Sequence, residues 1–321
     1  MTASIQPAEW LHYIKKEYLT AFIGDGGCAM KFAVPMDDKL RPEIFNGLAA
    51  LGEQTGFLVV KINAAETKVH MIDEIFFRTA EQIPWGNLSR RVIAKLVAEL
   101  GYSSVDSVDG PLYRQLAERN HIDSQLLLME IKKSIWDKVF KHRKLSKDFR
   151  TAMTNLCYAE LTGGQEGTTT IESLTEWLTG RNKALSTVKQ FQIFRKINRA
   201  TARYFFESLL HWVRLAGYPG IVVLLDAQRI MLARNPHDYG LFYSKAALMD
   251  AYEVLRQFID AGDKLEGCFI TVVPNLDFLE DHGRGLAAYE ALKFRVFDEI
   301  RDKNLVNPMA SLARIGEAIQ G

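Results

Sequence analysis

Three glycines and a lysine lie within eight positions of one another in the segment GDGGCAMKF, residues 24–32. Such residues can form a phosphate-binding loop, in which backbone N–H groups surround the phosphates and the lysine reaches the β and γ oxygens. The consensus G-x-x-x-x-G-K-[ST] is not met, because Asp25, Met30 and Phe32 occupy its glycine and hydroxyl positions around Lys31. The segment also precedes an apolar stretch, whereas a phosphate loop follows one. We interpret it as a turn that begins a strand.

A phosphate loop would follow that strand, at V-P-M-D-D-K-L, residues 34–40. In open parallel sheets, ligands bind at the carboxyl ends of the strands. The segment keeps a lysine, Lys39, but contains no glycine. Pro35 lacks a backbone N–H that could donate to a phosphate. Asp37 and Asp38 place negative charge where phosphate oxygens would lie, and like charges repel. Leu40 cannot ligate magnesium. We expect neither ATP nor magnesium to bind in the usual way, and nucleotide binding of another kind stays an alternative.

Two further polar residues follow apolar runs that read as buried strands. Asp226 ends IVVLLD, at the position where an NTPase aspartate holds magnesium, but Ala227 replaces the usual glutamate. Asn275 follows the next run and could sense a γ-phosphate, although Pro274 indicates a turn. Lys39, Asp226 and Asn275 therefore form a candidate vestigial nucleotide site, with capping or salt bridging as the alternative role of Asp226.

The elements that would position these residues follow from periodicity and turn signals. Strands are expected at residues 28–34, 57–62, 220–226, 267–273 and 310–315, and helices at 8–20, 42–54 and 244–261. From residue 70 to about 215 the pattern is helical, except for a flexible loop expected at 161–170.

The order strand, helix, strand indicates parallel pairing. We predict an α/β fold, a P-loop NTPase-like three-layer parallel sheet with a large helical insertion. The whole chain, 1–321, is expected to form one domain, with a core at about 20–80 and 216–316 and an insertion at about 84–215.

Composition excludes several classes of protein. The 321 residues are 48% hydrophobic and 25% charged with a net charge of +1, which is ordinary for a globular protein. The three cysteines, at 28, 157 and 268, have no zinc-ligand or disulfide spacing, so we expect no metal site. Neither a signal peptide nor a run of 18 apolar residues is present. We expect a cytoplasmic protein without a membrane association.

Positive charge is concentrated in two segments of the helical block. Eight Lys or Arg stand against two Asp from Lys132 to Arg150, with Trp136 and Phe140 among them, and seven stand against no acidic residue from Arg181 to Arg203. Such segments could contact nucleic-acid phosphates, meet an acidic partner subunit, or form a solvated face. The candidate contacts are Lys132, Lys133, Lys141, Arg143, Lys144, Arg195, Lys196, Arg199 and Arg203. Arg195, Arg199 and Arg203 would form one ridge if their stretch is helical.

Two parts of the chain, residues 22–79 and 177–315, resemble a known family. The resemblance rests on GFLVVKINAAETKVHMIDEIFF, on FRKINRATARYFFESLLHWVRLAGYPGIVVLLDA and on YEALKFRVFDEIRDKNLVNPMASLARI. These segments look like the BrxC/BrxD-type ATP-binding subunits of bacterial phage-exclusion (BREX) systems. The resemblance implies a Walker loop after the first strand and Asp-Glu after the third. In this chain Asp226 matches the aspartate of the family's Asp-Glu pair, and Ala227 replaces the glutamate. Of the family's Walker loop, at best the lysine is kept, as Lys39, while the glycines and the hydroxyl residue are replaced.

The resemblance implies a defence complex as the setting, with other defence subunits as partners, and the basic segments add DNA as a candidate partner. The family usually continues into a C-terminal lid, and we expect none in a chain that stops at Gly321. We therefore expect a non-hydrolysing pseudo-ATPase that scaffolds partner subunits or DNA, rather than an active enzyme. The alternatives are an ATPase that uses Lys39 and Asp226 in an atypical loop, and a protein-interaction module without a nucleic-acid role.

Overall fold

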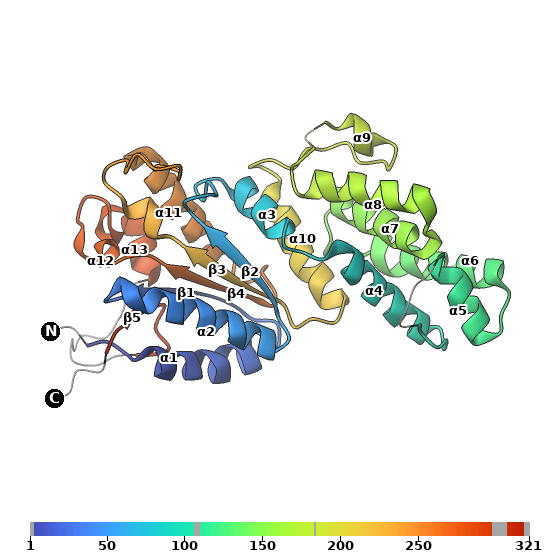
Figure 1. Cartoon of the computed structure of the whole chain (residues 1–321), viewed down its shortest axis with the longest axis horizontal. Coiled ribbons are helices and arrows are strands. Elements are labelled where there is room, and N and C mark those ends of the chain that lie inside the picture. The colour runs from blue at the N-terminus through green and yellow to red at the C-terminus, as the bar shows by residue number, and fades with distance from the viewer. Residues whose placement is uncertain (1–2, 106–109, 183, 297–306, 318–321) are drawn as a thin grey trace. The chain divides into compact units, whose positions relative to one another are not determined.

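The structure is a computed structural model that describes residues 3–105, 110–182, 184–296 and 307–317 (Figure 1). It divides into two compact units. The sheet unit comprises Met1–Thr79 and Pro219–Gly321, and the helical unit comprises Ala80–Tyr218.

The sheet unit is built on five parallel strands in the order β2-β3-β4-β1-β5. Their apolar runs suit strands that are covered on both faces. In register, Cys28 lies opposite Cys268, and Phe32 lies opposite Leu312. The strands are β1 (Cys28–Pro35), β2 (Leu58–Asn63), β3 (Ile221–Asp226), β4 (Cys268–Val273) and β5 (Leu312–Ile315). All five strand predictions are confirmed to within two residues at either end.

One face of the sheet is covered by α1 (Pro7–Tyr13), the π-helix η1 (Ile14–Phe22) and α2 (Arg41–Gln54). Trp10, Ile14 and Leu48 are fully buried in one core cluster with Val222 and Phe269 of the strands. Apolar residues at helical spacing form this face, as the pattern of residues 8–20 predicts.

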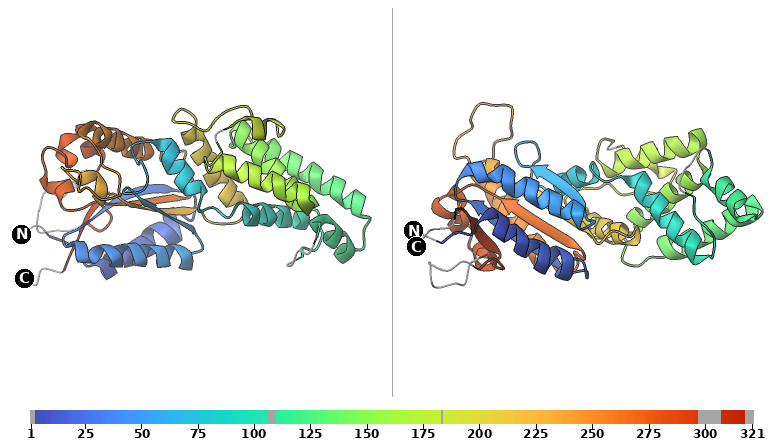
Figure 2. Two further views of the ribbon diagram at one scale, coloured as in Figure 1. Left: turned by 45° about the horizontal axis from the view of Figure 1, so that its top comes forward. Right: turned by 60° about the horizontal axis from the view of Figure 1, so that its bottom comes forward.

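The other face is covered by helices that follow β3 and β4 (Figure 2). Phe32 of β1 stacks on Phe278 with the ring centroids 5.3 Å apart, and Tyr252 meets Phe278 edge-on. The helices here are α11 (Lys245–Asp260), α12 (Asp277–Glu280), η5 (Leu286–Ala288) and α13 (Glu290–Val296). Two further short elements of the unit are α3 (Ile72–Ala80), which follows β2, and η4 (Gln228–Met231), which follows β3. The predicted α/β, P-loop NTPase-like three-layer fold is confirmed.

The helical unit lies between β2 and β3 in the sequence. Its central helix is α7, where Phe149, Met153, Leu156 and Cys157 are fully buried. The helices are α4 (Trp85–Glu99), α5 (Leu112–Asn120), α6 (Ser124–Ile135), the π-helix η3 (Trp136–Phe140), α7 (Lys147–Thr162), α8 (Gly164–Leu178), α9 (Ser186–Lys189) and α10 (Ala202–Leu215).

The predicted flexible loop at residues 161–170 is wrong, because α8 begins at Gly164 and only Gly163 interrupts the two helices. Thr168 and Thr169 donate hydroxyl hydrogen bonds to carbonyls four residues earlier, at 3.1 and 3.0 Å, which suits a helix. Gly167 lets α8 approach α7 closely, since a Cβ there would lie 2.8 Å from the Ala159 carbonyl oxygen. Close packing of two helices therefore overrides the loop-like composition.

Candidate functional site

The candidate site lies where three neighbouring strands end. β3, β4 and β1 are adjacent in the sheet and end at Asp226, Val273 and Pro35. The segment after β1 forms a short 3-10 helix, η2 (Asp38–Leu40), which leads directly into α2. This is the edge of a parallel sheet where ligands bind in related folds.

The backbone amides of the segment after β1 are already engaged. The amide of Met36 donates to the Ile315 carbonyl at 2.8 Å, and that of Lys39 donates to Asp37 Oδ1 at 2.9 Å. The amide of Leu40 donates to the Asp37 carbonyl at 3.0 Å, and that of Arg41 donates to the Asp38 carbonyl. A phosphate loop works by presenting such amides to phosphate oxygens. Here these four are satisfied by the protein itself.

Arg41 is the residue that joins the ends of β3 and β4 to the segment after β1, and it is not among the site residues predicted from the sequence. Its side chain is 10% exposed. Nη1 donates to Asp226 Oδ1 at 3.1 Å and to the Val273 carbonyl at 2.9 Å. Nη2 donates to Asp38 Oδ1 at 3.0 Å and to the Pro274 carbonyl at 2.8 Å. One planar guanidinium thus satisfies four acceptors at the site, which its fork of donors permits.

Asp38 and Gln228 complete this network. Asp38 accepts from Arg41 through Oδ1 and from Gln228 Nε2 through Oδ2, the latter at 3.2 Å. The amide of Gln228 donates to Asp226 Oδ1 at 3.1 Å. Three carboxylates, those of Asp37, Asp38 and Asp226, face two cations, Lys39 and Arg41. The formal charge of the cluster is therefore −1, which opposes the approach of another anion.

Among the described residues, no hydrogen bond or ion pair joins Lys39, Asp226 and Asn275 directly to one another. Lys39 has a side chain that is 90% exposed, and its Nζ lies 4.0 Å from Asp37 Oδ2. Asp226 is held by Arg41. Asn275 donates through Nδ2 to Asp277 Oδ2 at 3.0 Å, and its buried Oδ1 has no hydrogen-bond partner within the described part of the chain.

A signal for Arg41 does exist in the sequence. A cation in the first turn of a helix is disfavoured by the helix dipole. Arg41 stands at the first position of α2, three residues after Asp38, so it requires acidic or carbonyl partners. Which partners it finds depends on strand ends that lie 185 and 232 residues later in the sequence.

The first set of basic residues surrounds the turn between α6 and α7. Lys132 and Lys133 stand near the end of α6, and the Lys132 ammonium lies 5.5 Å from the centroid of the Tyr158 ring. Lys141 pairs with Asp137 at 2.7 Å. Arg143 and Lys144 are exposed in the turn before α7. These side chains lie within one short stretch of the helical unit.

The second set does not form the helical ridge that its spacing suggested. Arg195, Lys196 and Arg199 are exposed in an irregular segment, and α10 begins only at Ala202. The Asn198 side chain accepts from the Ala200 amide at 3.0 Å, and the Thr201 hydroxyl donates to the Lys196 carbonyl at 3.1 Å. Such side-chain bonds to the backbone compete with helix formation. Arg203, in the first turn of α10, pairs with Glu207 at 3.1 Å.

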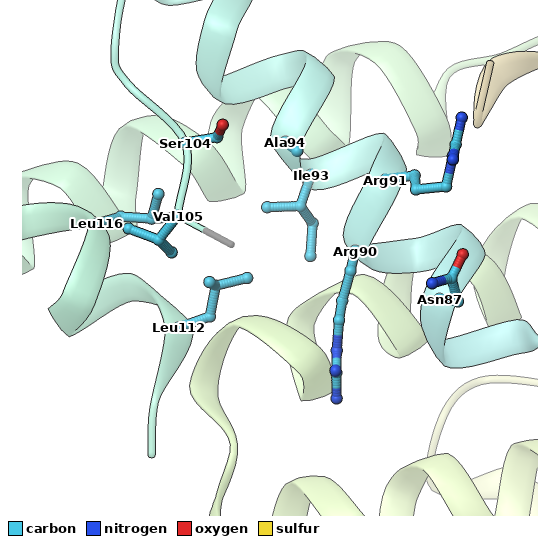
Figure 3. Close-up of a pocket in the computed structure, with 9 residues that line it drawn as sticks. All are labelled: Asn87, Arg90, Arg91, Ile93, Ala94, Ser104, Val105, Leu112 and Leu116. Carbon is cyan, nitrogen blue, oxygen red and sulfur yellow. The ribbon is translucent and has the colours of Figure 1, made fainter. Parts of the chain in front are cut away.

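A pocket of about 270 Å³ lies in the helical unit (Figure 3). Its two arginines are engaged within the protein: Arg90 Nε lies 2.6 Å from Glu160 Oε2, and Arg91 Nε donates to the Ala216 carbonyl at 2.9 Å. The lining residues are Asn87, Arg90, Arg91, Ile93, Ala94, Ser104, Val105, Leu112 and Leu116. Because both guanidinium groups have partners, the pocket offers no free cation to a ligand from its arginines.

The described residues contain no cluster of three or more His, Cys, Asp or Glu that could hold a metal ion. Among the described helices, none is long and apolar enough to cross a membrane.

Comparison with known proteins gives one family. A family model described as "BREX system ATP-binding protein BrxC/D" matches residues 111–317. The match includes β3, β4, β5 and most of the helical unit, and it begins after β1 and the segment that carries Arg41. No curated protein and no solved structure matches the chain.

Proposed function

The chain belongs to the BrxC/BrxD family of BREX system ATP-binding proteins, and we propose that it is a non-hydrolysing pseudo-ATPase subunit of a BREX antiphage defence complex. In this role the P-loop NTPase-like fold serves as a scaffold. The edge of the sheet that would hold nucleotide is closed by the protein's own side chains.

The observation that carries this proposal is the position of Arg41. In an NTPase, the aspartate at the end of the corresponding strand holds magnesium through water. Here Asp226 is neutralised by the Arg41 guanidinium at 3.1 Å, which also uses the carbonyls at the end of β4. A magnesium ion would have to displace a hydrogen-bonded cation, and it would gain no hydroxyl ligand from Leu40. The internal arginine therefore supports a site that does not need nucleotide.

The segment after β1 supports the same conclusion independently. Four of its amides already donate to acceptors of the protein. Asp37 and Asp38 add negative charge on the side from which phosphates would approach. Phosphate binding would then require breaking the exposed η2 turn as well as the Arg41 network, and each buried acceptor that Arg41 leaves unsatisfied costs about 1–3 kcal/mol.

Calorimetric titration with Mg-ATP tests this proposal. We expect no saturable heat with the wild-type chain, and none with Lys39→Ala or Asp226→Asn. Arg41→Ala should not create binding either, because the engaged amides and the two aspartates of the segment remain. Micromolar binding that is lost in Lys39→Ala would overturn the proposal and favour an ATPase with an atypical loop.

Scaffolding has a separate test. The tagged chain should capture other BREX subunits from cells equally well with and without added ATP, and Lys39→Ala and Asp226→Asn should capture them as efficiently as the wild type. Capture that requires ATP, or that fails in Asp226→Asn while the variant stays folded, would contradict a nucleotide-independent role.

We assign the docking of a partner to the exposed cations of the helical unit. Arg195, Lys196 and Arg199 carry positive charge on an irregular segment, and Lys133 and Arg143 carry it around the turn between α6 and α7. Exposed cations that are clustered in this way suit an acidic partner subunit or DNA.

A further inference from the structure

An exposed aromatic stack lies at the end of α6. The rings of Trp136 and Phe140 are 3.9 Å apart between centroids, with an interplanar angle of 16°. The Arg150 guanidinium lies 5.7 Å from the Phe140 centroid. Both aromatic residues belong to η3, where the Lys141 amide donates to the Trp136 carbonyl five residues earlier, at 3.1 Å. Single-turn π-helices of this kind are frequent at functional sites.

Trp136 differs from the other tryptophans of the helical unit. Its exposed fraction is 44%, whereas Trp85, Trp177 and Trp212 are at most 3% exposed and form part of the core. Packing within the helical unit therefore does not explain why a tryptophan stands at position 136. Phe140 is only partly exposed. The indole is thus the accessible member of the stacked pair.

Several exposed cations lie close to this indole in the sequence. Lys133 lies one helical turn before Trp136, and Lys138 and Lys141 lie within five residues after it; all three are exposed. Lys141 pairs with Asp137, and Lys138 pairs with Glu99 of α4 at 3.5 Å, so these two acidic residues offset part of the positive charge. Arg143 adds a further exposed cation. The stretch from Lys132 to Arg150 carries eight basic residues against two acidic ones.

An exposed aromatic ring with basic residues nearby in the sequence can bind an unpaired base together with its flanking phosphates. The base would stack on the indole, and the phosphates would meet the lysines. Bases inside a duplex cannot reach the ring, because their faces are covered by their neighbours. We propose that Trp136 ends a stacking platform that binds single-stranded nucleic acid, with Lys133 and Arg143 as phosphate contacts.

This inference goes beyond the pseudo-ATPase role and is independent of whether the site at Arg41 binds nucleotide. A protein partner is the competing occupant, because Leu126 and Met129 of α6 are also exposed, by 49% and 69%. Met129 lies seven residues before Trp136, about two helical turns, and Leu126 lies one turn before Met129, so an apolar partner along this side of α6 would contact both together with the indole. Stacking of a base would leave them untouched, which makes them matched controls.

The experiment measures the fluorescence anisotropy of a labelled oligo(dT) of about 20 nucleotides on titration with the full chain at several salt concentrations. Trp136→Ala should weaken binding by about 5- to 150-fold, the range observed for loss of one stacked base. Trp136→Phe should retain most of the affinity. Lys133→Ala should reduce the salt slope by about 0.7, as expected for one lost phosphate contact on a single strand. Met129→Ala and Leu126→Ala should bind as the wild type does.

A duplex of matched length separates stacking from simple charge attraction. We expect the duplex to bind more weakly than the single strand and to be insensitive to Trp136→Ala. The proposal is overturned if Trp136→Ala leaves the oligo(dT) affinity unchanged, or if it weakens single strand and duplex equally. It is also overturned if Trp136→Ala and Met129→Ala leave the oligo(dT) affinity unchanged and both reduce capture of another BREX subunit. None of these outcomes bears on the Mg-ATP titration.

Discussion

The Nη1 atom of Arg41 lies 3.1 Å from Oδ1 of Asp226, a residue 185 positions later in the chain. This ion pair ties the first turn of α2 to the end of β3. The same guanidinium reaches the end of β4, where Nη1 also donates to the Val273 carbonyl and Nη2 donates to the Pro274 carbonyl. A single side chain therefore links the ends of two strands at the edge of the sheet where ligands bind in related folds.

Arg41→Ala should destabilise the sheet unit. The substitution removes the cation that pairs with Asp226 and one donor to each of the Val273 and Pro274 carbonyls, while Asp226 keeps the Gln228 amide and Val273 keeps the Ala227 amide. Breaking a buried ion pair from one side costs about 3–5 kcal/mol. Arg41→Lys should recover only part of this, because an ammonium cannot satisfy four acceptors in the guanidinium geometry. Hydrogen exchange of β3 and β4 amides measures the effect. A loss below about 1 kcal/mol for Arg41→Ala would show that the network contributes little.

The two carboxylates that pair with Arg41, those of Asp226 and Asp38, should contribute unequally to the free energy of unfolding. The Asp226 side chain is 24% exposed and that of Asp38 is 56% exposed, so solvent screens the second pair more strongly. We expect Asp226→Asn to cost about 1–3 kcal/mol and Asp38→Asn less than about 1 kcal/mol. Denaturant unfolding of both variants gives the comparison. Equal losses would mean that exposure does not decide the strength of these pairs.

Lys31 should make stability depend on pH in the alkaline range. Burial lowers the pKa of Lys31 from 10.5 to about 8, while its ammonium donates to the Met309 and Ala310 carbonyls. Between pH 8 and 10.5 the unfolded chain then binds more protons than the folded one, so the free energy of unfolding should rise with pH in this window and stay level below it. Lys31→Met should lack this rise. Parallel pH curves for the two proteins would contradict the prediction.

Gly220 permits the close approach of two chain segments at the start of β3. A Cβ at this position would lie 1.8 Å from the Gly267 carbonyl oxygen, which also accepts a hydrogen bond from the Ile221 amide at 2.9 Å. Gly220→Ala should therefore cost more than about 2 kcal/mol through displaced backbone. Gly262→Ala is the matched control, since its Cβ would lie 3.3 Å from the nearest atom, the Ile259 carbonyl oxygen. Thermal unfolding of both variants should separate them, and similar melting temperatures would refute the steric argument.

The exposed cations before α10 should act in docking. The triple variant Arg195→Glu, Lys196→Glu and Arg199→Glu should weaken duplex DNA binding and lower its salt slope if these residues meet phosphates. If they instead meet an acidic subunit, the variant should lose capture of that subunit while DNA binding stays unchanged. Since Arg203 already pairs with Glu207, Arg203→Ala should change either readout less. A triple variant that behaves as the wild type in both assays would exclude a docking role for this segment.

The sequence by itself determined the sheet. Strands such as Ile221–Asp226 and Cys268–Val273 are short apolar runs bounded by turn signals, and helices such as Lys245–Asp260 carry a clear 3.6-residue pattern. These signals are local, because residues that are neighbours in the sequence show whether a strand is buried on both faces or a helix on one face. The lack of glycine in the segment after β1 is also visible from the local sequence.

The tertiary structure decided the rest. Residues 164–170 have the composition of a loop, but packing of α8 on α7 makes them helical. Arg195 and Arg199 have helical spacing, but hydrogen bonds of Asn198 and Thr201 keep their segment irregular. Arg41 became a central residue only because β3, β4 and β1 are neighbours in the sheet. Which charge meets which carboxylate depends on strand order, and strand order brings together residues that no local pattern connects.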